Sequence, residues 1–600
     1  MRIFFAILFL PIRILIFIIR VAFLSLAKGN HVIIEIPSRF NDSEKSFLLR
    51  RLQPEDENPF FIEFIANLQA ITQDSRVKYL SIIVPNIQFG FAEIHSIKYE
   101  IEKMQEKGIE VIGYGQEGDL KSLYLLAICN KRYTSDTAEF HSQLPSADAM
   151  FFGELIQKLK LRVDVFQSGP YKSFGEMFTR KNFSKEARGN LEAVLTDLKK
   201  AILGGFKSET NVDEKILQMP ILTGSFLREI NFFSDFVELV DFKKFFTRID
   251  AKLMNSNELD SIENNQENIS KKKIKSKNKQ ISKISKPLTL SNIENKNRIK
   301  NFKIFGNRLT TVAILPLKGE ISSGKQEELE SKSGTIEAYP ILHAIESLKD
   351  NPQISAVLLE IDSPGGSAFD SEKIYKALVD LGKTKPVYAH LGNTCASGGY
   401  YLACAAKKIY SPSIAILGSI GTIMMRFDLE GFYKKIGISK DRIGFYPNRE
   451  IFSDTGKLSK TSELFLKKEI ARVENLFLKR VNDARKVSDT VLKQMSGGRI
   501  FAPSVFLQNQ MIDGIQSIQE TLDIVKADLN KKTIQIEYMA PKYNLKSAIR
   551  ESIPFVQMIH KLTKGMQNPI ANLFTLQSTS DKNIRILNKN ILAESIRDLF

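Results

Sequence analysis

A serine flanked by small residues, Ser397, offers the first chemistry in the sequence. It stands in the run Thr394-Cys-Ala-Ser-Gly-Gly-Tyr400. A strand-like apolar pattern over residues 386–392 precedes this run and an apolar helical pattern follows it, so Ser397 is predicted at a strand-to-helix turn. A serine at such a turn can cap the helix, as serines commonly do. It can also be an exposed nucleophile, with the amide of Gly398 available to an oxyanion.

A second glycine turn supports the nucleophile. Gly365 and Gly366 lie in Asp362-Ser-Pro-Gly-Gly-Ser367, at the end of another predicted strand. Adjacent glycines let the backbone turn sharply and expose N–H groups. Such amides can hold the charge that develops on a carbonyl oxygen, and removing one donor costs about 3–4 kcal/mol. Alone, the motif is equally consistent with a plain turn; together with Ser397 it favours a nucleophile and an oxyanion hole.

A serine nucleophile needs a general base. After Ser397 the only histidine is His560, far along the chain, and His390 lies on the incoming strand. The remaining histidines stand in no recognisable triad setting. A lysine can serve if it is desolvated, because burial populates the neutral amine near pH 7. The candidate is Lys172, in Ser168-Gly-Pro-Tyr-Lys-Ser-Phe-Gly-Glu-Met-Phe178, although its local sequence alone would indicate an ordinary surface lysine.

An internal repeat singles out this lysine. Residues 77–85 and 354–362 are both short β-branched runs typical of buried strands, and residues 124–133 resemble residues 401–410. Both pairs have the same offset of 277 residues (354 − 77 and 401 − 124). A helical stretch and a second apolar strand follow the first strand in each half. This alternation predicts parallel α/β units.

Each half of the repeat lacks the residue that the other retains. The position 277 residues before Ser397 is Leu120. The stretch around Lys172 aligns with residues 443–449, where Pro447 replaces the lysine. A single active site that takes its serine from one half and its lysine from the other explains this pattern.

The repeat divides the chain into five predicted parts. They are a membrane anchor or interfacial helix (1–28), an N-terminal repeat with the lysine (30–250), a Lys/Asn-rich flexible linker (251–302), a C-terminal repeat with the serine (303–535) and an amphipathic tail (536–600).

The N-terminus is apolar over residues 3–27, about long enough for a helix to cross a bilayer. No small-residue cleavage site follows at the expected place, which favours an uncleaved anchor. Pro11 interrupts the stretch, and Arg13 and Arg20 would each cost about 2.5–3.5 kcal/mol at the bilayer centre. The two arginines share one helical face, which also suits a helix lying in the interface. We expect membrane attachment, with the spanning and interfacial modes both open.

Composition excludes some other functions. With 43% apolar and 26% charged residues, the chain is typical of a globular protein with a sizeable core. The formal charge is +17, but eight lysines lie between Lys271 and Lys286, in the predicted linker. No aromatic residues for base stacking accompany them, so we expect no nucleic-acid partner. The three cysteines (Cys129, Cys395 and Cys404) show no Cys-x-x-Cys spacing, and we expect neither a metal nor a disulfide.

Taken together, these motifs resemble the signal peptide peptidase A (SppA) family in its long, duplicated form, whose domains belong to the ClpP/crotonase superfamily. The resemblance covers most of residues 45–530 apart from the linker. It rests on residues 171–178, 362–367, 396–400, 418–421 (Gly-Ser-Ile-Gly), 498–501 (Gly-Arg-Ile-Phe) and 511–514 (Met-Ile-Asp-Gly). Cys395 departs from the family pattern, since alanine is usual there.

The resemblance assigns a role to each candidate residue: Ser397 as nucleophile, Lys172 as general base and acid, Ser419 as the serine that orients the lysine, and Gly398, Gly365 and Gly366 as the oxyanion hole. It implies cleavage of leftover signal peptides and other apolar peptides through an acyl-enzyme, without a metal or nucleotide. It also implies a homotetramer anchored in the inner membrane, with its catalytic domains facing the periplasm.

Two other functions stay open in the sequence. A crotonase-like acyl-CoA hydratase or isomerase would share the oxyanion architecture but use carboxylates, for which Asp362 and Glu372 are candidates. That function explains neither the serine and lysine pattern nor the apolar N-terminus. The non-enzymatic alternative is an inactive membrane scaffold, against which the presence of both Ser397 and Lys172 argues.

Overall fold

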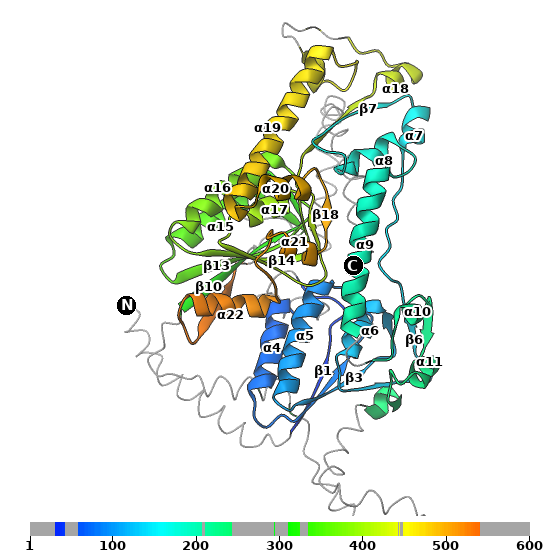
Figure 1. Ribbon diagram of the computed structural model, residues 1–600, viewed down its shortest axis with the longest axis vertical. Helices are drawn as coiled ribbons and strands as arrows, with labels where there is room; N and C mark the ends of the chain where they lie inside the picture. Colours follow the sequence, from blue (N-terminus) through cyan, green and yellow to red (C-terminus); the bar gives the residue numbers. More distant parts are fainter. Residues whose placement is uncertain are drawn as a thin grey trace, which may run out of the picture. The chain divides into compact units, whose positions relative to one another are not determined.

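The computed structural model describes most of the chain between residues 30 and 539 (Figure 1). The described residues are 30–41, 58–206, 210–242, 288, 293, 310–324, 334–441, 443 and 448–539. The predicted anchor (1–28), nearly all of the predicted linker, most of the predicted tail, Pro447 and His560 lie outside them. Within the described residues, no helix combines the length and apolarity that crossing a membrane requires.

The chain forms two compact units. Of the described residues, the first unit takes those up to Leu144 and those from Ile202 to 293. The second unit takes Pro145–Ala201 and the residues from 310 onward. The segment that carries Lys172 therefore belongs to the same unit as Ser397.

A parallel five-stranded sheet is the centre of the first unit, in the order β1-β2-β3-β5-β9. Its strands are β1 (His31–Glu35), β2 (Tyr79–Ile83), β3 (Glu110–Tyr114), β5 (Lys131–Thr134) and β9 (Asp235–Phe236). Its main helices are α4 (Phe61–Gln73), α5 (Phe91–Glu106) and α6 (Leu120–Ala127). In α5, Ile94, Ile97, Ile101 and Met104 recur at helical spacing and are buried, so this face of the helix packs into the core.

Smaller elements complete the first unit. A three-stranded sheet has the order β4-β6-β8, and two short helices accompany it. The bounds are β4 (Glu117–Asp119), β6 (Glu139–His141), β8 (Ile221–Thr223), α10 (Glu214–Leu217) and α11 (Gly224–Glu229).

The second unit contains a larger sheet with the order β18-β16-β14-β13-β10-β20, in which β15 joins β14 to β19. All pairs are parallel except β16 with β18. The strands are β10 (Thr310–Lys318), β13 (Ile354–Ser363), β14 (Val387–Ala396), β15 (Lys408–Ser411), β16 (Ile416–Gly418), β18 (Ile500–Phe501), β19 (Gly514–Ile515) and β20 (Ile534–Tyr538). The predicted alternation of strands and helices with parallel pairing is confirmed.

Helices cover both faces of this sheet. α15 (Ala338–Asp350), α16 (Ala368–Gly382) and α17 (Gly398–Ala403) lie on one side, and α22 (Ile518–Asp528) lies on the other (Figure 1). Alternate residues of the central strands enter the core under α15 to α17, among them Leu315, Leu359 and Leu391. Their neighbours on the opposite face, such as Ile314 and Leu358, are also fully buried. This double burial explains the continuous apolar runs that the sequence shows.

The remaining elements of the second unit are a small strand pair and further helices. β7 (Arg162–Gln167) pairs antiparallel with β17 (Ile423–Asp428), and β11 (Glu320–Ser322) pairs with β12 (Thr335–Glu337). The helices are α7 (Gly153–Lys158), η1 (Ser173–Gly175), α8 (Glu176–Thr179), α9 (Lys185–Phe206, whose residues from Ile202 belong to the first unit), α18 (Glu430–Lys435), η4 (Arg449–Phe452), α19 (Lys460–Arg485), α20 (Asp489–Met495) and α21 (Pro503–Gln508).

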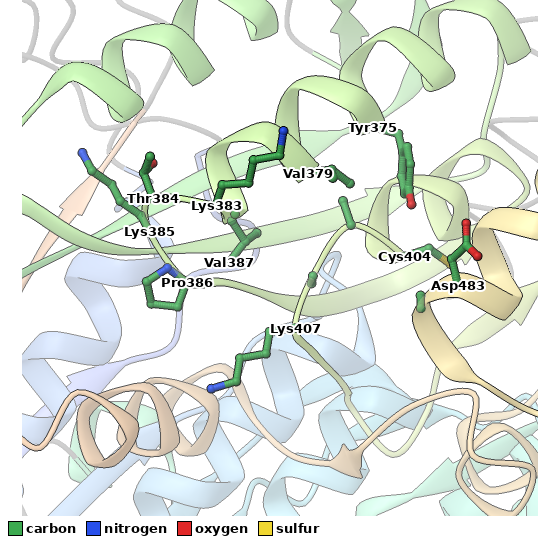
Figure 2. Close-up of a pocket in the computed structure, with 14 residues that line it drawn as sticks. Tyr375, Val379, Lys383, Thr384, Lys385, Pro386, Val387, Cys404, Lys407 and Asp483 are labelled. Atoms are coloured by element: carbon green, nitrogen blue, oxygen red, sulfur yellow. The ribbon is translucent and has the colours of Figure 1, made fainter.

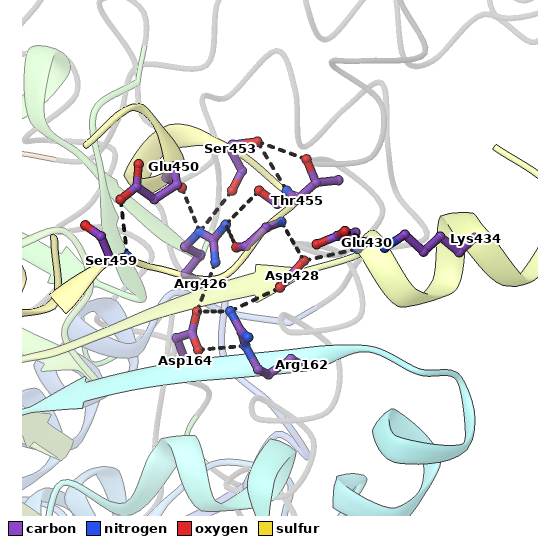
Figure 3. Close-up of polar contacts among 11 residues, drawn as sticks. Arg162, Asp164, Arg426, Asp428, Glu430, Lys434, Glu450, Ser453, Thr455 and Ser459 are labelled. Atoms are coloured by element: carbon purple, nitrogen blue, oxygen red, sulfur yellow. Dashed lines mark hydrogen bonds and ion pairs between the residues drawn. The ribbon is translucent and has the colours of Figure 1, made fainter. Parts of the chain in front are cut away.

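A buried arginine ties the β7–β17 pair together (Figure 3). The side chain of Arg426 is only 5% exposed, and its Nη1 lies 2.9 Å from Oδ2 of Asp164 across the two strands. Its other nitrogens donate to the carbonyl groups of Glu450, Ser453, Thr455 and Gly456. A buried guanidinium needs this full set of acceptors, because an unpaired charge in the interior is costly. The network therefore fixes β7, the strand that leads to Lys172.

We expect Arg426→Met to lower the free energy of unfolding by about 3 kcal/mol, since it leaves Asp164 without its buried partner. The loss stays at the low end for buried pairs because Asp164 keeps a hydrogen bond from Arg162 Nε at 3.0 Å. Urea denaturation measures the change. Arg472→Met is the control: Arg472 pairs with Glu469 on the exposed side of α19, with 64% of its side chain exposed, and should cost less than about 0.5 kcal/mol. Equal losses in the two variants would contradict the prediction.

Candidate active site

Ser397 sits between β14 and α17, as the sequence predicts. β14 ends at Ala396 and α17 begins at Gly398. The backbone of Ser397 has φ 52° and ψ −119°, a conformation that is strained for a residue with a side chain and that concentrates at functional sites. Its hydroxyl makes no capping hydrogen bond to α17. The helix-capping interpretation of this serine is therefore wrong, and the hydroxyl is available for other contacts.

A bulge in β14 brings the strand to this turn. β14 pairs with β15 over Tyr388–His390 and with β16 over Thr394–Ala396, so it changes partner along its length. The carboxylate of Asp362 lies at the irregularity and accepts hydrogen bonds from the backbone N–H groups of Asn393 and Thr394. These bonds satisfy amides that the interrupted ladder leaves unpaired.

The Gly365-Gly366 turn lies directly against Ser397. A Cβ on Gly365 would stand 2.7 Å from Cβ of Ser397 and 2.8 Å from the backbone nitrogen of Gly398, and the residue has φ +104°. Only glycine allows this approach. Next to it, Ile321 donates its N–H to the Gly365 carbonyl at 2.8 Å and accepts the N–H of Ser367 at 2.9 Å.

Two backbone amides at this contact are available to an oxyanion. Gly366 forms an isolated parallel β-bridge with Ile321. The hydrogen bonds of this bridge involve the carbonyl of Gly365 and the N–H of Ser367, so the N–H of Gly366 points away from Ile321. The N–H of Gly398 belongs to the first turn of α17 and has no acceptor within the helix.

Lys172 follows β7 and precedes η1, and its side chain reaches Ser397. Its Nζ lies 3.0 Å from Oγ of Ser397. The same Nζ donates to the carbonyl oxygen of Ser419 at 2.8 Å and to its Oγ at 2.9 Å. Lys172 is 8% exposed, and burial lowers the pKa of its amine to about 7. Near neutral pH a large fraction of this amine is therefore uncharged.

The hydrogen-bond geometry suits a neutral amine. Such an amine has two hydrogens and one lone pair, and Ser419 offers two acceptors. With both hydrogens directed to Ser419, the lone pair faces the Ser397 hydroxyl and can accept its proton. Ser419 itself has φ 51° and is held by a hydrogen bond of 2.6 Å from its N–H to the carbonyl of Arg499.

Other candidates from the sequence are engaged elsewhere. Among the described residues, Lys172 is the side chain that hydrogen-bonds Ser397 Oγ, while His390 Nε2 lies 3.2 Å from the carbonyl oxygen of Gln516. Glu372 is bound by Arg480 and by the Tyr401 hydroxyl. With Asp362 committed to the β14 bulge, neither carboxylate recruited for the hydratase alternative is free.

No metal site was found in the described part of the chain, where no three His, Cys, Asp or Glu side chains converge. Cys129, Cys395 and Cys404 are buried, and none of the three forms a disulfide. Burial raises the pKa of the Cys395 and Cys404 thiols, so both stay protonated and unreactive.

A surface pocket of the second unit contains none of the candidate residues (Figure 2). Three lysines, Lys383, Lys385 and Lys407, contribute to its lining. Lys383 pairs with Asp380, Lys407 pairs with Asp528, and Lys385 donates to backbone carbonyls. The three lysine side chains do not converge on a common point, so they do not form an anion-binding site in this pocket (Figure 2).

Sequence reasoning missed one part of this site. The backbone of Gly497–Arg499 bonds to Tyr171 and to Ser419, although the motif at 498–501 carried no assigned role. The signals in the sequence were a pair of adjacent glycines and the match of residues 498–501 to the family pattern.

The chain is similar to known proteases. The family model for peptidase family S49 matches residues 380–532, which include Ser397 and Ser419. A serine protease SPPA, chloroplastic, from Arabidopsis thaliana is 24% identical over 524 residues, covering 86% of this chain and 73% of that protein. Protease 4 from Haemophilus influenzae is 24% identical over 487 residues, covering 78% and 72%.

A shorter match concerns a protein from Enterococcus faecium that is provisionally named signal peptide peptidase SppA. It is 27% identical over 200 residues, which cover 33% of this chain and 58% of that protein. The chain is a serine protease of the S49 family and belongs to its SppA branch, in the long form.

Proposed function

We propose that this protease is a membrane-bound endopeptidase that cleaves apolar peptides, including spent signal peptides, with Ser397 and Lys172 as its catalytic dyad. The observation that carries the proposal is the buried Nζ of Lys172 at 3.0 Å from Oγ of Ser397. An amine can activate a serine when burial lowers the pKa of the amine and when the amine is hydrogen-bonded to the serine hydroxyl.

In the first step, neutral Lys172 takes the hydroxyl proton as Ser397 Oγ bonds to the carbonyl carbon of the scissile peptide. The amides of Gly398 and Gly366 stabilise the negative charge on the carbonyl oxygen. The C–N bond then breaks, and the ammonium of Lys172 gives its proton to the departing amine. An acyl-enzyme on Ser397 remains.

In the second step, water attacks the ester of the acyl-enzyme and Lys172 accepts a proton from it. The C–O bond to Ser397 breaks, and the proton returns to Ser397 Oγ. Ser419 takes part in both steps as a positioning residue, because its two oxygens hold the amine hydrogens while the lone pair faces the reacting atoms.

The substrate class rests on resemblance. The relative from Enterococcus faecium bears the name of a signal peptide peptidase, which supports peptide substrates of that kind for this chain. Anchoring through residues 3–27 in the inner membrane, catalytic domains on the periplasmic side and assembly as a homotetramer complete the proposal. These three features follow from the family resemblance and the apolar N-terminus.

We also infer that the two α/β units arose by internal duplication, as two ClpP/crotonase-like repeats. In the first unit the pairing order is β1-β2-β3-β5-β9, and in the second the corresponding path is β10-β13-β14-β15-β19. The strands appear in the same order along the chain. The domain boundaries 30–250 and 303–535 belong to this proposal, with the segment around Lys172 packing in the second unit.

Replacing either member of the dyad should abolish peptide hydrolysis. We expect Ser397→Ala and Lys172→Met to lower kcat/KM for a fluorogenic apolar peptide by at least about 10²–10⁴-fold, the usual contribution of a general base. A fluorophosphonate should label the parent protein at Ser397, located by peptide mass mapping, and should label Lys172→Met far more slowly.

The matched control for Lys172→Met is Lys385→Met. Lys385 is also a buried lysine of the second unit, and burial also lowers its pKa, but its Nζ donates to the backbone carbonyl of Asn351. This variant should keep the activity of its folded fraction. Near-normal turnover in Lys172→Met would refute the dyad.

The pH dependence follows from the direction of the Lys172 shift. Its pKa is lowered to about 7, so the amine is protonated and unable to accept a proton below that pH. We expect kcat/KM to rise with pH along a single-proton limb with its midpoint near 7 and to level off above it. A midpoint near 10, the value of an exposed lysine, would show that the amine is not desolvated in the working enzyme.

A further inference from the structure

We propose that the glycine turn Gly497-Gly498, together with Arg499, is the element that positions the amine of Lys172 against Ser397 and Ser419. This inference rests on the proposed dyad and assigns a role to a motif that the mechanism above does not use. The three residues act as positioning residues, since they contact the segments that carry Lys172 and Ser419 rather than the reacting atoms.

The turn is hydrogen-bonded to both segments that meet in the dyad. On one side, the N–H of Tyr171 donates to the Gly497 carbonyl at 3.2 Å. On the other, the N–H of Gly498 donates to the Ile420 carbonyl at 2.9 Å, and the N–H of Ser419 donates to the Arg499 carbonyl at 2.6 Å. The turn thus sets the spacing between the backbone that carries Lys172 and the backbone that carries its acceptors.

The absence of a side chain at Gly498 is required by Lys172 itself. A Cβ at Gly498 would stand 2.4 Å from the backbone nitrogen of Lys172, 2.6 Å from its Cα and 2.7 Å from its Cβ. Two of these three atoms are main chain, so rotating a side chain would not relieve the overlap. The lysine backbone would have to move away from the turn.

Gly497 and Gly498 share a positive φ but differ in what an added side chain would contact. Both have positive φ, +73° and +88°, and both would be strained by a side chain. A Cβ at Gly497 would meet no atom within 4 Å. Comparing an alanine at each position therefore distinguishes the effect of backbone strain from the effect of contact with Lys172.

Arg499 holds the residue that precedes the lysine. Its guanidinium carbon lies 4.2 Å from the ring centroid of Tyr171, and its Nη2 donates to the Tyr171 hydroxyl at 2.9 Å. Its Nη1 donates to the carbonyl of Gln494 at 2.8 Å. Stacking and two hydrogen bonds leave this guanidinium, and with it the Tyr171 ring, little freedom.

Moving the lysine backbone should change both rate and pH dependence. A misplacement of about 1 Å can cost about 10²-fold in rate. Water that enters beside the amine would favour its charged form and raise the pKa of Lys172. Among the described residues, the charged or titratable groups at residues 168–172 include Arg499, which stacks on Tyr171, and Glu474, which is hydrogen-bonded to Ser168. Burial raises the pKa of Glu474, and the hydrogen bond with Ser168 acts in the opposite direction.

The test measures kcat, KM and the pH midpoint of kcat/KM for Gly498→Ala and Gly497→Ala. We expect Gly498→Ala to lower kcat at pH 7 by about 10–100-fold, to leave KM within about threefold and to move the midpoint upward by at least half a pH unit. Gly497→Ala introduces comparable backbone strain without a contact to Lys172, so its midpoint should move less than that of Gly498→Ala. Equal kcat values and equal midpoints in the two variants would overturn the proposal.

A second variant covers the case in which Gly498→Ala does not fold. Arg499→Gln removes the stacked guanidinium and keeps the backbone carbonyl that binds Ser419. It should lower kcat by about 3–10-fold and move the midpoint in the same upward direction, whereas an unchanged midpoint would contradict the role given to Arg499. Failure of the dyad itself has a different signature, because Lys172→Met would then remain active whatever the glycine variants do.

Discussion

The burial of a single amine is the constraint on which the rest of this site depends. Lys172 donates to two oxygens of Ser419 and lies within hydrogen-bond distance of Ser397, and burial brings its pKa to about 7. Desolvation keeps much of the amine neutral near physiological pH, so that it can accept a proton, while Ser419 supplies acceptors that compensate for the loss of water. Without those acceptors, the buried amine would lack hydrogen-bond partners. Without burial, the lysine would stay charged.

Backbone geometry, more than side-chain chemistry, creates this environment. Ser397 and Ser419 both adopt positive φ, and each follows a strand that ends at the same edge of the larger sheet. The β14 bulge, stabilised by Asp362, and the close approach of Gly365 place the Ser397 hydroxyl away from the helix it precedes. Strain of this kind persists only where surrounding contacts over-determine it. Here the contacts come from residues 362–365 for Ser397 and from Arg499 for Ser419.

Features that depend on neighbouring residues could be predicted from the sequence, whereas contacts between distant segments could be predicted only in part. The strand-to-helix turn at Ser397 and the parallel α/β pairing follow from apolar periodicity and glycine content, which act over a few residues. Lys172 could be singled out only through the repeat and the family resemblance, because its burial depends on partners more than 200 residues away. That its segment packs with the C-terminal strands has no local signature. The role of Gly498 was missed because a close backbone approach leaves nothing in the sequence but a glycine.

In the proposed dyad, a lysine occupies the position that a histidine often holds. A histidine base is oriented by one hydrogen bond to its second ring nitrogen, whereas an amine rotates freely about its last bond and needs two acceptors to fix its lone pair. Ser419 provides both from one residue, but only while its backbone stays at a fixed distance from that of Lys172. The Gly497-Gly498 turn is bonded to both backbones, so the precision that a ring supplies within one side chain is supplied here by the main chain of a third segment.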